Sequence, residues 1–193
     1  AVLKIIITAG SGGRGYSRKG VSNAQSIVSI HDIPSHYQHW SKQGISVTNS
    51  PIQLGLNPLL KGIKHLNRLE QVFIRRELDI AHSDDFIVTN LNDIIVEASS
   101  ANVFWMRGRS LYTPIIKNSG VLGIYRENLL SFDSSIEKVE EKTEDLSTIT
   151  SMFICNSVMG IVPVHTYEER KLDILPVLDF KQRFLTDSQT KAN

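Results

Sequence analysis

Most apolar positions of this chain fall in short runs, which are typical of strands rather than helices. Glycine, proline and asparagine separate these runs and indicate turns. The first run, at residues 2–8, is rich in isoleucine and is predicted to be a buried strand. The predicted strands are 2–8, 25–30, 45–49, 85–90, 94–99, 101–107, 110–114, 138–142 and 152–156, with a last hairpin within 161–173.

Longer segments have helical spacing. Ile63, Leu66, Leu69 and Phe73 recur at steps of three and four residues, which predicts one apolar stripe on a helix from about 64 to 78. The other expected helices are 124–132 and 175–187, with a short helical turn at 145 and a connection into a new unit at 31–41. Antiparallel strands with helices packed on them indicate an α+β fold. We expect a domain boundary between residues 33 and 34.

The composition narrows the classes of partner. The 193 residues are 41% hydrophobic and 21% charged, with a formal net charge of +1. This balance lacks the basic excess that binds nucleic acid or anionic membranes, so neither is an expected partner. No apolar run approaches the roughly 20 residues of a membrane span. The single Cys155 excludes an internal disulfide framework and fits a reducing, cytoplasmic compartment.

The glycine-rich segment GSGGRGYSRKG contains the spacing G-x-G-x-x-G at Gly10, Gly12 and Gly15. This spacing indicates dinucleotide binding only where a helix begins at the last glycine. No helical periodicity follows here, so a flexible loop between two strands is the favoured interpretation. Arg14 on this loop is a candidate for binding a substrate carboxylate, because a guanidinium can hold both oxygens. The histidines show no metal-ligand spacing, and no metal is expected.

Four features together suggest a cofactor site. Lys64 is predicted in the first turn of a helix, where the helix dipole disfavours a cation. Such a position lowers the pKa of a lysine, as covalent bonding to a carbonyl cofactor requires. Glu97 ends an apolar strand and should be partly desolvated, while the turns at 123–125 and 156–157 are candidate anion sites. These are the parts of a pyridoxal phosphate site, although a lysine in a first helical turn is more often a surface residue.

Five segments carry a resemblance to a known family: GIKHLNRLEQV, VEASSANVFW, LYTP, GVLGIYR and FICNSVMGIVPV. In this order they resemble the aminodeoxychorismate lyases, which are fold type IV pyridoxal-phosphate enzymes together with branched-chain and D-amino-acid aminotransferases. The resemblance extends from about Val2 to Val164. It implies a D-amino-acid aminotransferase-like fold, a pyridoxal 5'-phosphate cofactor, a homodimer, and conversion of 4-amino-4-deoxychorismate to 4-aminobenzoate and pyruvate for folate biosynthesis.

The resemblance also implies roles for individual residues. Lys64 matches the lysine to which the cofactor is attached, and Glu97 matches the carboxylate that pairs with the pyridine nitrogen. The backbone at Ile124 and Tyr125 matches one phosphate-binding turn. Asn156 and Ser157 match the second phosphate contact. Two further residues match positions near the cofactor ring without an assigned role, namely Ser100 and Asn102.

Two departures favour a lyase over an aminotransferase. Branched-chain aminotransferases usually have a tyrosine five residues after the lysine, where this chain has Leu69, and their later loop differs from NSVMGIVPV. Family members also have an N-terminal segment of some tens of residues before the strand at Val2. We therefore expect this chain to be part of a longer protein or to be inactive alone. A fold type IV aminotransferase and a non-catalytic, truncated relative remain the alternatives.

Overall fold

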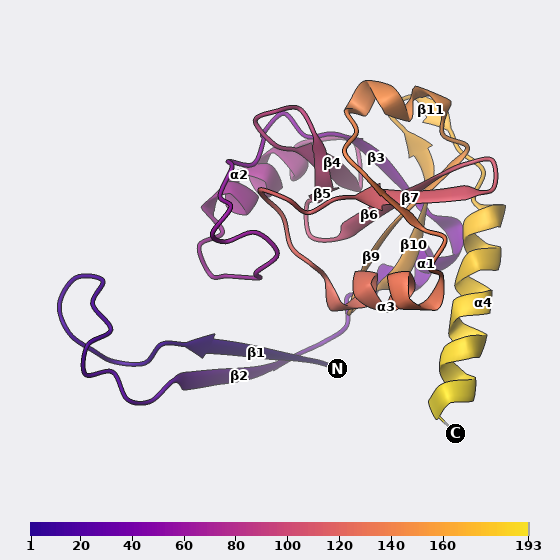
Figure 1. Ribbon diagram of the computed structural model, residues 1–193. Helices are drawn as coiled ribbons and strands as arrows, with labels where there is room; N and C mark the ends of the chain where they lie inside the picture. Colours follow the sequence, from indigo (N-terminus) through magenta and orange to yellow (C-terminus); the bar gives the residue numbers. More distant parts are fainter. Residues whose placement is uncertain (193) are drawn as a thin grey trace. The chain divides into compact units, whose positions relative to one another are not determined.

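The first compact unit is the N-terminal hairpin, Ala1–Tyr37, in a computed structural model that describes residues 1–192. Strand β1 (Val2–Thr8) pairs antiparallel with β2 (Gln25–His31), and the glycine-rich loop joins them, which confirms the loop interpretation (Figure 1). A Cβ at Gly10 would lie 2.0 Å from the Asn23 carbonyl oxygen, so only glycine fits there.

The prediction that the first strand is buried is wrong. Leu3, Ile5 and Ile7 on β1 are 57–70% exposed, and Ile30 on β2 is 75% exposed. The reason is topological, because within the described residues these two strands pair only with each other. The apolar composition correctly predicts a strand here. It does not predict whether another part of the protein covers the side chains of that strand.

The second unit, from Gln38 onward, is built on one mixed sheet. Its strand order is β5-β4-β3-β10-β9-β6-β7-β8, with the short β11 added beside β10. Pairing is antiparallel except at β3–β10, β3–β4 and β7–β8. The strands are β3 Ile45–Asn49, β4 Asp85–Thr89, β5 Ile95–Ala98, β6 Asn102–Arg107, β7 Ser110–Pro114, β8 Glu137–Val139, β9 Ser151–Asn156, β10 Gly160–Tyr167 and β11 Arg170–Lys171.

Both faces of the central strands are buried, which explains their continuous apolar sequences. On β6 and β9, alternate residues face two different cores. Trp105 and Met152 lie in one core with Leu146 of the 3-10 helix η1 (Thr143–Thr148), whereas Phe104 and Phe153 lie in the other. Phe104 and Phe153 stack with ring centroids 4.8 Å apart.

Helices cover the sheet on two sides. Helices α3 (Ile124–Phe132) and α4 (Leu175–Ala192) lie side by side on the face that carries Phe153, and Phe132 contacts Phe184 edge-on (Figure 1). Helix α2 (Leu69–Leu78) instead packs on β4 and β5. No helix among the described residues is long and apolar enough to span a membrane.

Two helix predictions need correction. The segment 31–41, predicted to be a connection, contains most of α1 (Tyr37–Gln43). The helix predicted from about residue 64 begins only at Leu69, and its buried residues are Ile74 and Leu78. The predicted stripe is therefore wrong, because Ile63 and Leu66 lie before the helix, and all four of its members are exposed. Their exposed fractions are 54% for Ile63, 64% for Leu66, 60% for Leu69 and 41% for Phe73.

Candidate active site

Lys64 lies on a segment without regular secondary structure and not in a helix. The segment is fixed by backbone pairing, since the Gly62 N–H donates to the Gly120 carbonyl (2.9 Å) and the Leu122 N–H donates to the Gly62 carbonyl (3.1 Å). Lys64 itself is exposed. The argument from the helix dipole is therefore wrong. Lys64 instead follows, by two residues, the isolated parallel bridge between Gly62 and Val121.

Arg68 explains why the helix does not begin earlier. Its Nε donates to the His65 carbonyl (3.0 Å), and a terminal nitrogen donates to the Ile63 carbonyl (2.9 Å). The guanidinium therefore holds the carbonyls on both sides of Lys64, which a helix would use for its own hydrogen bonds. The sequence prediction did not assign a role to this arginine.

Glu97 is the buried acid of the site, as the sequence predicted. It lies within β5, next to the last residue Ala98, with 6% of its surface exposed, and desolvation raises its pKa to about 7. The Val121 N–H donates to Oε2 (2.9 Å), and the positive charges of Arg68 and Lys64 act against the rise. Among the described residues, no protein group donates to Oε1, so this oxygen can accept a hydrogen bond from a ligand.

Asn102, on β6, binds the other backbone polar group of Val121. Its Nδ2 donates to the Val121 carbonyl (2.9 Å), so Glu97 and Asn102 hold the two ends of one residue. Helix α3 begins directly after Gly123, and a Cβ at Gly123 would lie 2.1 Å from the Asn102 Oδ1. The glycine therefore lets the start of α3 approach the strand that carries Asn102.

The start of α3 has the character of an anion site. No side chain caps it, and its first backbone N–H groups, including those of Ile124 and Tyr125, precede the first helical hydrogen bond from Glu127 to Gly123. Ile124, the first residue of the helix, is 75% exposed. Tyr125 is half-buried, and burial raises its pKa to about 12, so its hydroxyl stays protonated.

A second turn follows β9. Asn156 Oδ1 accepts from the N–H groups of Val158 (2.9 Å) and Met159 (3.0 Å), and its Nδ2 donates to the Ser100 carbonyl (3.2 Å). Ser157 is exposed within this turn. The Asn156 side chain thus shapes the turn and ties it to the Ser99–Ala101 loop, which follows Glu97 in the sequence.

Asp85 also holds that loop through a hydrogen bond. The sequence analysis did not identify Asp85 as a site residue. The carboxylate is 4% exposed, and its Oδ1 accepts from the N–H groups of Phe86 (2.7 Å) and Ser99 (3.1 Å). Burial raises its pKa. An acidic residue directly before the apolar run FIVT was the available signal.

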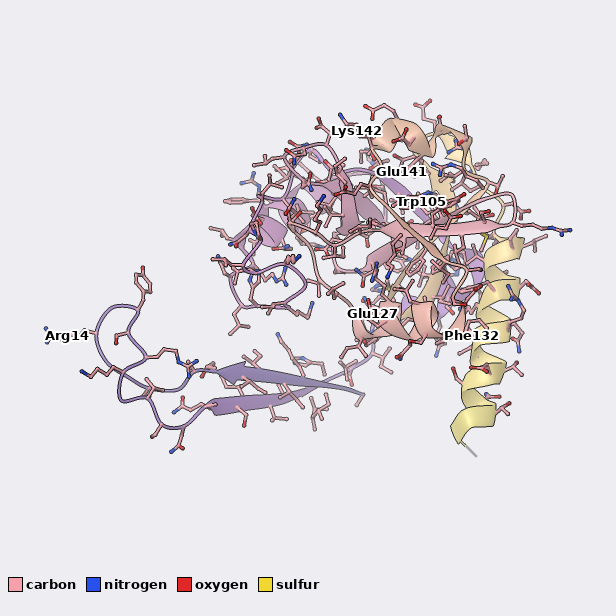
Figure 2. The ribbon with its side chains drawn as sticks, in the orientation of Figure 1. Arg14, Trp105, Glu127, Phe132, Glu141 and Lys142 are labelled. Atoms are coloured by element: carbon pink, nitrogen blue, oxygen red, sulfur yellow. The ribbon has the colours of Figure 1, made fainter. Side chains whose placement is uncertain are left out.

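The predicted site residues thus divide into two groups. Glu97 and the start of α3 are linked through residues 121–123, and Lys64 is linked to the same peptides through Gly62. Arg14 belongs to the N-terminal unit, exposed on the loop between β1 and β2 (Figure 2). Its assignment to the substrate stays a prediction.

The mixed α+β fold, with a curled sheet and packed helices, is that of fold type IV aminotransferase-like proteins. The chain matches the family model for class IV amino-transferases over residues 1–167, and it belongs to this family. The predicted fold is confirmed. The family consists of pyridoxal-phosphate enzymes.

Individual relatives include both lyases and aminotransferases. The chain is 34% identical over 179 residues to the aminodeoxychorismate lyase of Vibrio harveyi, covering 90% of this chain and 66% of that protein. It is 36% identical over 112 residues to a probable branched-chain-amino-acid aminotransferase of Thermotoga maritima, covering 55% of this chain and 40% of that protein. The chain therefore spans less than two thirds of the length of these relatives.

The solved structure of a lyase is also similar to this chain. The 4-amino-4-deoxychorismate lyase of Pseudomonas aeruginosa superposes with a TM-score of 0.87 at 29% identity, covering 96% of this chain and 70% of that one.

The residues of this chain fit pyridoxal phosphate. Oε1 of Glu97 can accept a hydrogen bond at a buried position, as a protonated pyridine nitrogen would provide. The uncapped start of α3 offers backbone donors to a phosphate. Lys64 supplies an exposed amine on a segment tied to the same residues.

Proposed function

We propose that the full protein is a pyridoxal-phosphate-dependent lyase that converts 4-amino-4-deoxychorismate to 4-aminobenzoate and pyruvate. The observation that carries the proposal is Glu97, a buried carboxyl with a pKa of about 7 that keeps one oxygen available beside the segment of Lys64. Similarity to the Vibrio harveyi and Pseudomonas aeruginosa lyases supports the choice of reaction.

Each residue has a distinct task in this reaction. The cofactor, when bound, supplies an electron sink for the substrate carbon that bears nitrogen. Lys64 would anchor the cofactor until the substrate amine takes its place, and the freed Lys64 amine would then take the proton from that carbon. Glu97 accepts a hydrogen bond from the protonated ring nitrogen, and this positive charge favours the ionised carboxylate. The start of α3 and the turn at Asn156 and Ser157 bind the phosphate.

The chemistry of the substrate explains why so few groups are needed. Removal of the proton is followed by departure of pyruvate from the adjacent carbon, and the remaining ring becomes aromatic. Aromatisation makes this step favourable, so the protein mainly orients the substrate and maintains the charge at Glu97. Arg14 is proposed to bind a substrate carboxylate.

Lys64→Ala in the full protein should abolish both cofactor attachment and nearly all pyruvate release. The measurement is absorbance with added pyridoxal phosphate, followed by borohydride reduction and peptide mass analysis. In the unsubstituted protein the label should appear on the peptide that contains Lys64. Lys138→Ala is the matched control, because Lys138 is an exposed lysine on β8. Normal pyruvate release by Lys64→Ala would refute the proposal.

The same preparation tests the second candidate, an amino-acid aminotransferase. Similarity to the Thermotoga maritima protein favours it over part of the chain. Amino-group transfer to a 2-oxo acid, without release of pyruvate from aminodeoxychorismate, would establish the aminotransferase instead. Leu69, where branched-chain aminotransferases usually have tyrosine, argues for the lyase.

We further propose that the protein acts as a cytoplasmic homodimer. The exposed apolar side chains of Leu66, Leu69 and Phe73 support a covered surface on α2 and the segment before it. Sedimentation of the full protein should give twice the mass of one chain. A monomer at micromolar concentration would contradict the proposal.

A further inference from the structure

Arg126 is a buried charge in the first turn of α3, the turn that the proposed function assigns to the phosphate. It is the third residue of this helix, and 2% of its side chain is exposed. A fully buried arginine is rare unless its charge is paired. The start of a helix is also the end at which the macrodipole disfavours a cation. Both terms are unfavourable, so a negative charge close to this turn is expected to offset them.

The protein itself supplies only part of that negative charge. One terminal nitrogen of Arg126 donates to the Pro114 carbonyl at the end of β7 (2.9 Å), and the other donates to the Glu127 carboxylate (2.5 Å). Nε is buried and, among residues 1–192, has no hydrogen-bond partner. Glu127, labelled on α3 in Figure 2, has a side chain that is 52% exposed. A carboxylate half in water is screened, so it offsets a buried charge only weakly.

Besides Glu127, the ionisable group in the described chain that influences Arg126 is the thiol of Cys155, and this thiol is neutral. Burial raises the pKa of the Cys155 thiol to about 12, although the charge of Arg126 acts in the opposite direction. Burial also lowers the pKa of Arg126, but an arginine side chain in a protein stays protonated near pH 7. The positive charge of Arg126 is therefore only partly offset by the described residues.

A phosphate at the start of α3 would supply the missing negative charge. The N–H groups of Ile124 and Tyr125 belong to the same turn as Arg126. A phosphate ester carries about 1.5 to 2 negative charges near pH 7. We propose that the buried charge of Arg126 makes this site selective for the phosphorylated form of its ligand. The guanidinium acts through its electric field, which is poorly screened in the interior, and does not contact the phosphate.

This inference rests on the proposed function, because it concerns the same phosphate site. Two substitutions separate the charge of Arg126 from its hydrogen bond to Pro114. Arg126→Gln removes the charge and keeps an amide that can donate, whereas Arg126→Lys keeps the charge. If Arg126 only held α3 against β7, a loss of binding would not depend on whether the ligand carries a phosphate.

The first test compares pyridoxal phosphate with pyridoxal in the full protein, by absorbance titration at one salt concentration. Arg126→Gln should weaken the binding of pyridoxal phosphate roughly tenfold or more, the size expected for one poorly screened charge, and that of pyridoxal less than about twofold. Arg126→Lys should retain the preference for the phosphorylated ligand. Arg109→Gln, at an exposed arginine, is the matched control and should change neither affinity. An equal loss for both ligands in Arg126→Gln would overturn the proposal.

The second test uses inorganic phosphate and needs neither cofactor nor turnover. Phosphate should raise the thermal unfolding midpoint of the cofactor-free protein above its value in chloride at equal ionic strength. Arg126→Gln should lose most of this rise, whereas Arg126→Lys and Arg109→Gln should keep it. Any general effect of phosphate on folding is common to all four proteins and cancels. A rise of the same size in Arg126→Gln and Arg109→Gln would overturn the proposal.

The two tests also separate this inference from the proposed function. If the unsubstituted protein forms no borohydride-reducible bond between pyridoxal phosphate and Lys64, the proposed function fails. The measurement with inorganic phosphate alone then decides whether Arg126 confers selectivity for a phosphate. Conversely, a rise that persists in Arg126→Gln overturns the inference even where pyruvate release by the unsubstituted protein is normal.

Discussion

Glu97 connects the stability of the protein to its chemistry. Its folded pKa of about 7 lies above the ordinary value of 4.5 because the carboxyl is desolvated. Between these values the folded state holds a proton that the unfolded state has released. The contribution of Glu97 to the free energy of unfolding is therefore largest below about pH 4.5, and it falls as the pH rises to about 7. The loss amounts to about 3 kcal/mol by linkage.

Glu97→Gln should remove this pH dependence. Glutamine is never ionised and can still accept from the Val121 N–H, so the cofactor-free variant should lose less stability than the parent between pH 4.5 and 7. Urea unfolding at several pH values measures the difference. Asp85, whose pKa is also raised by burial, is present in both proteins and cancels. Parallel curves would contradict the assignment of the shift to Glu97.

The elements show which features could be predicted from sequence. Strands such as 45–49 and 110–114, and the helix 124–132, were predicted at their observed bounds because local apolar patterns and flanking glycines determine them. The start of α2 was not, because Arg68 binds carbonyls that only the folded chain brings within reach. In the site, the burial of Glu97 followed from its apolar strand. The exposed position of Lys64 depends on pairing between Gly62 and the distant Gly120.

The buried face of α2 can be tested directly. Ile74 is 1% exposed and packs on β4 and β5, so Ile74→Ala should destabilise the protein by about 2–5 kcal/mol. Leu69→Ala changes a residue of the originally predicted stripe that is 60% exposed in a single chain, and in the monomer, below the concentration at which a dimer forms, it should cost less than about 1 kcal/mol. Chemical denaturation at one protein concentration compares them. A larger loss of stability in Leu69→Ala than in Ile74→Ala would support the predicted stripe as the buried face of the helix.

The start of α3 depends on the absence of one side chain. In Gly123→Ala, the added Cβ would lie 2.1 Å from Asn102 Oδ1, so either the Asn102 side chain or the start of α3 must move, and both movements strain the Asn102–Val121 hydrogen bond. We expect a loss of about 1–3 kcal/mol and weaker binding of pyridoxal phosphate. Gly13→Ala is the control, because its Cβ would meet its nearest neighbour at 3.8 Å. Equal affinity of Gly123→Ala and the control would exclude α3 from the phosphate site.

At the scale of the whole molecule, the three apolar cores all come from the second unit. Their buried members run from Ile45 to Phe184, and none lies in the N-terminal hairpin. Each face of the central strands therefore has its own partners within this unit. Self-sufficient cores are what distinguish an independently folding domain from a segment that depends on its neighbours.

A fragment that begins at Gln38 should therefore fold without the hairpin. We expect one cooperative thermal transition and a near-ultraviolet circular dichroism signal from Trp105, which is fully buried between the sheet and η1. The intact chain provides the reference for both signals. Since the hairpin contributes no buried core residue, its loss should leave the near-ultraviolet spectrum largely unchanged. A fragment with normal secondary structure but no near-ultraviolet signal, and with strong binding of a hydrophobic dye, would show that packing of the cores requires residues 1–37.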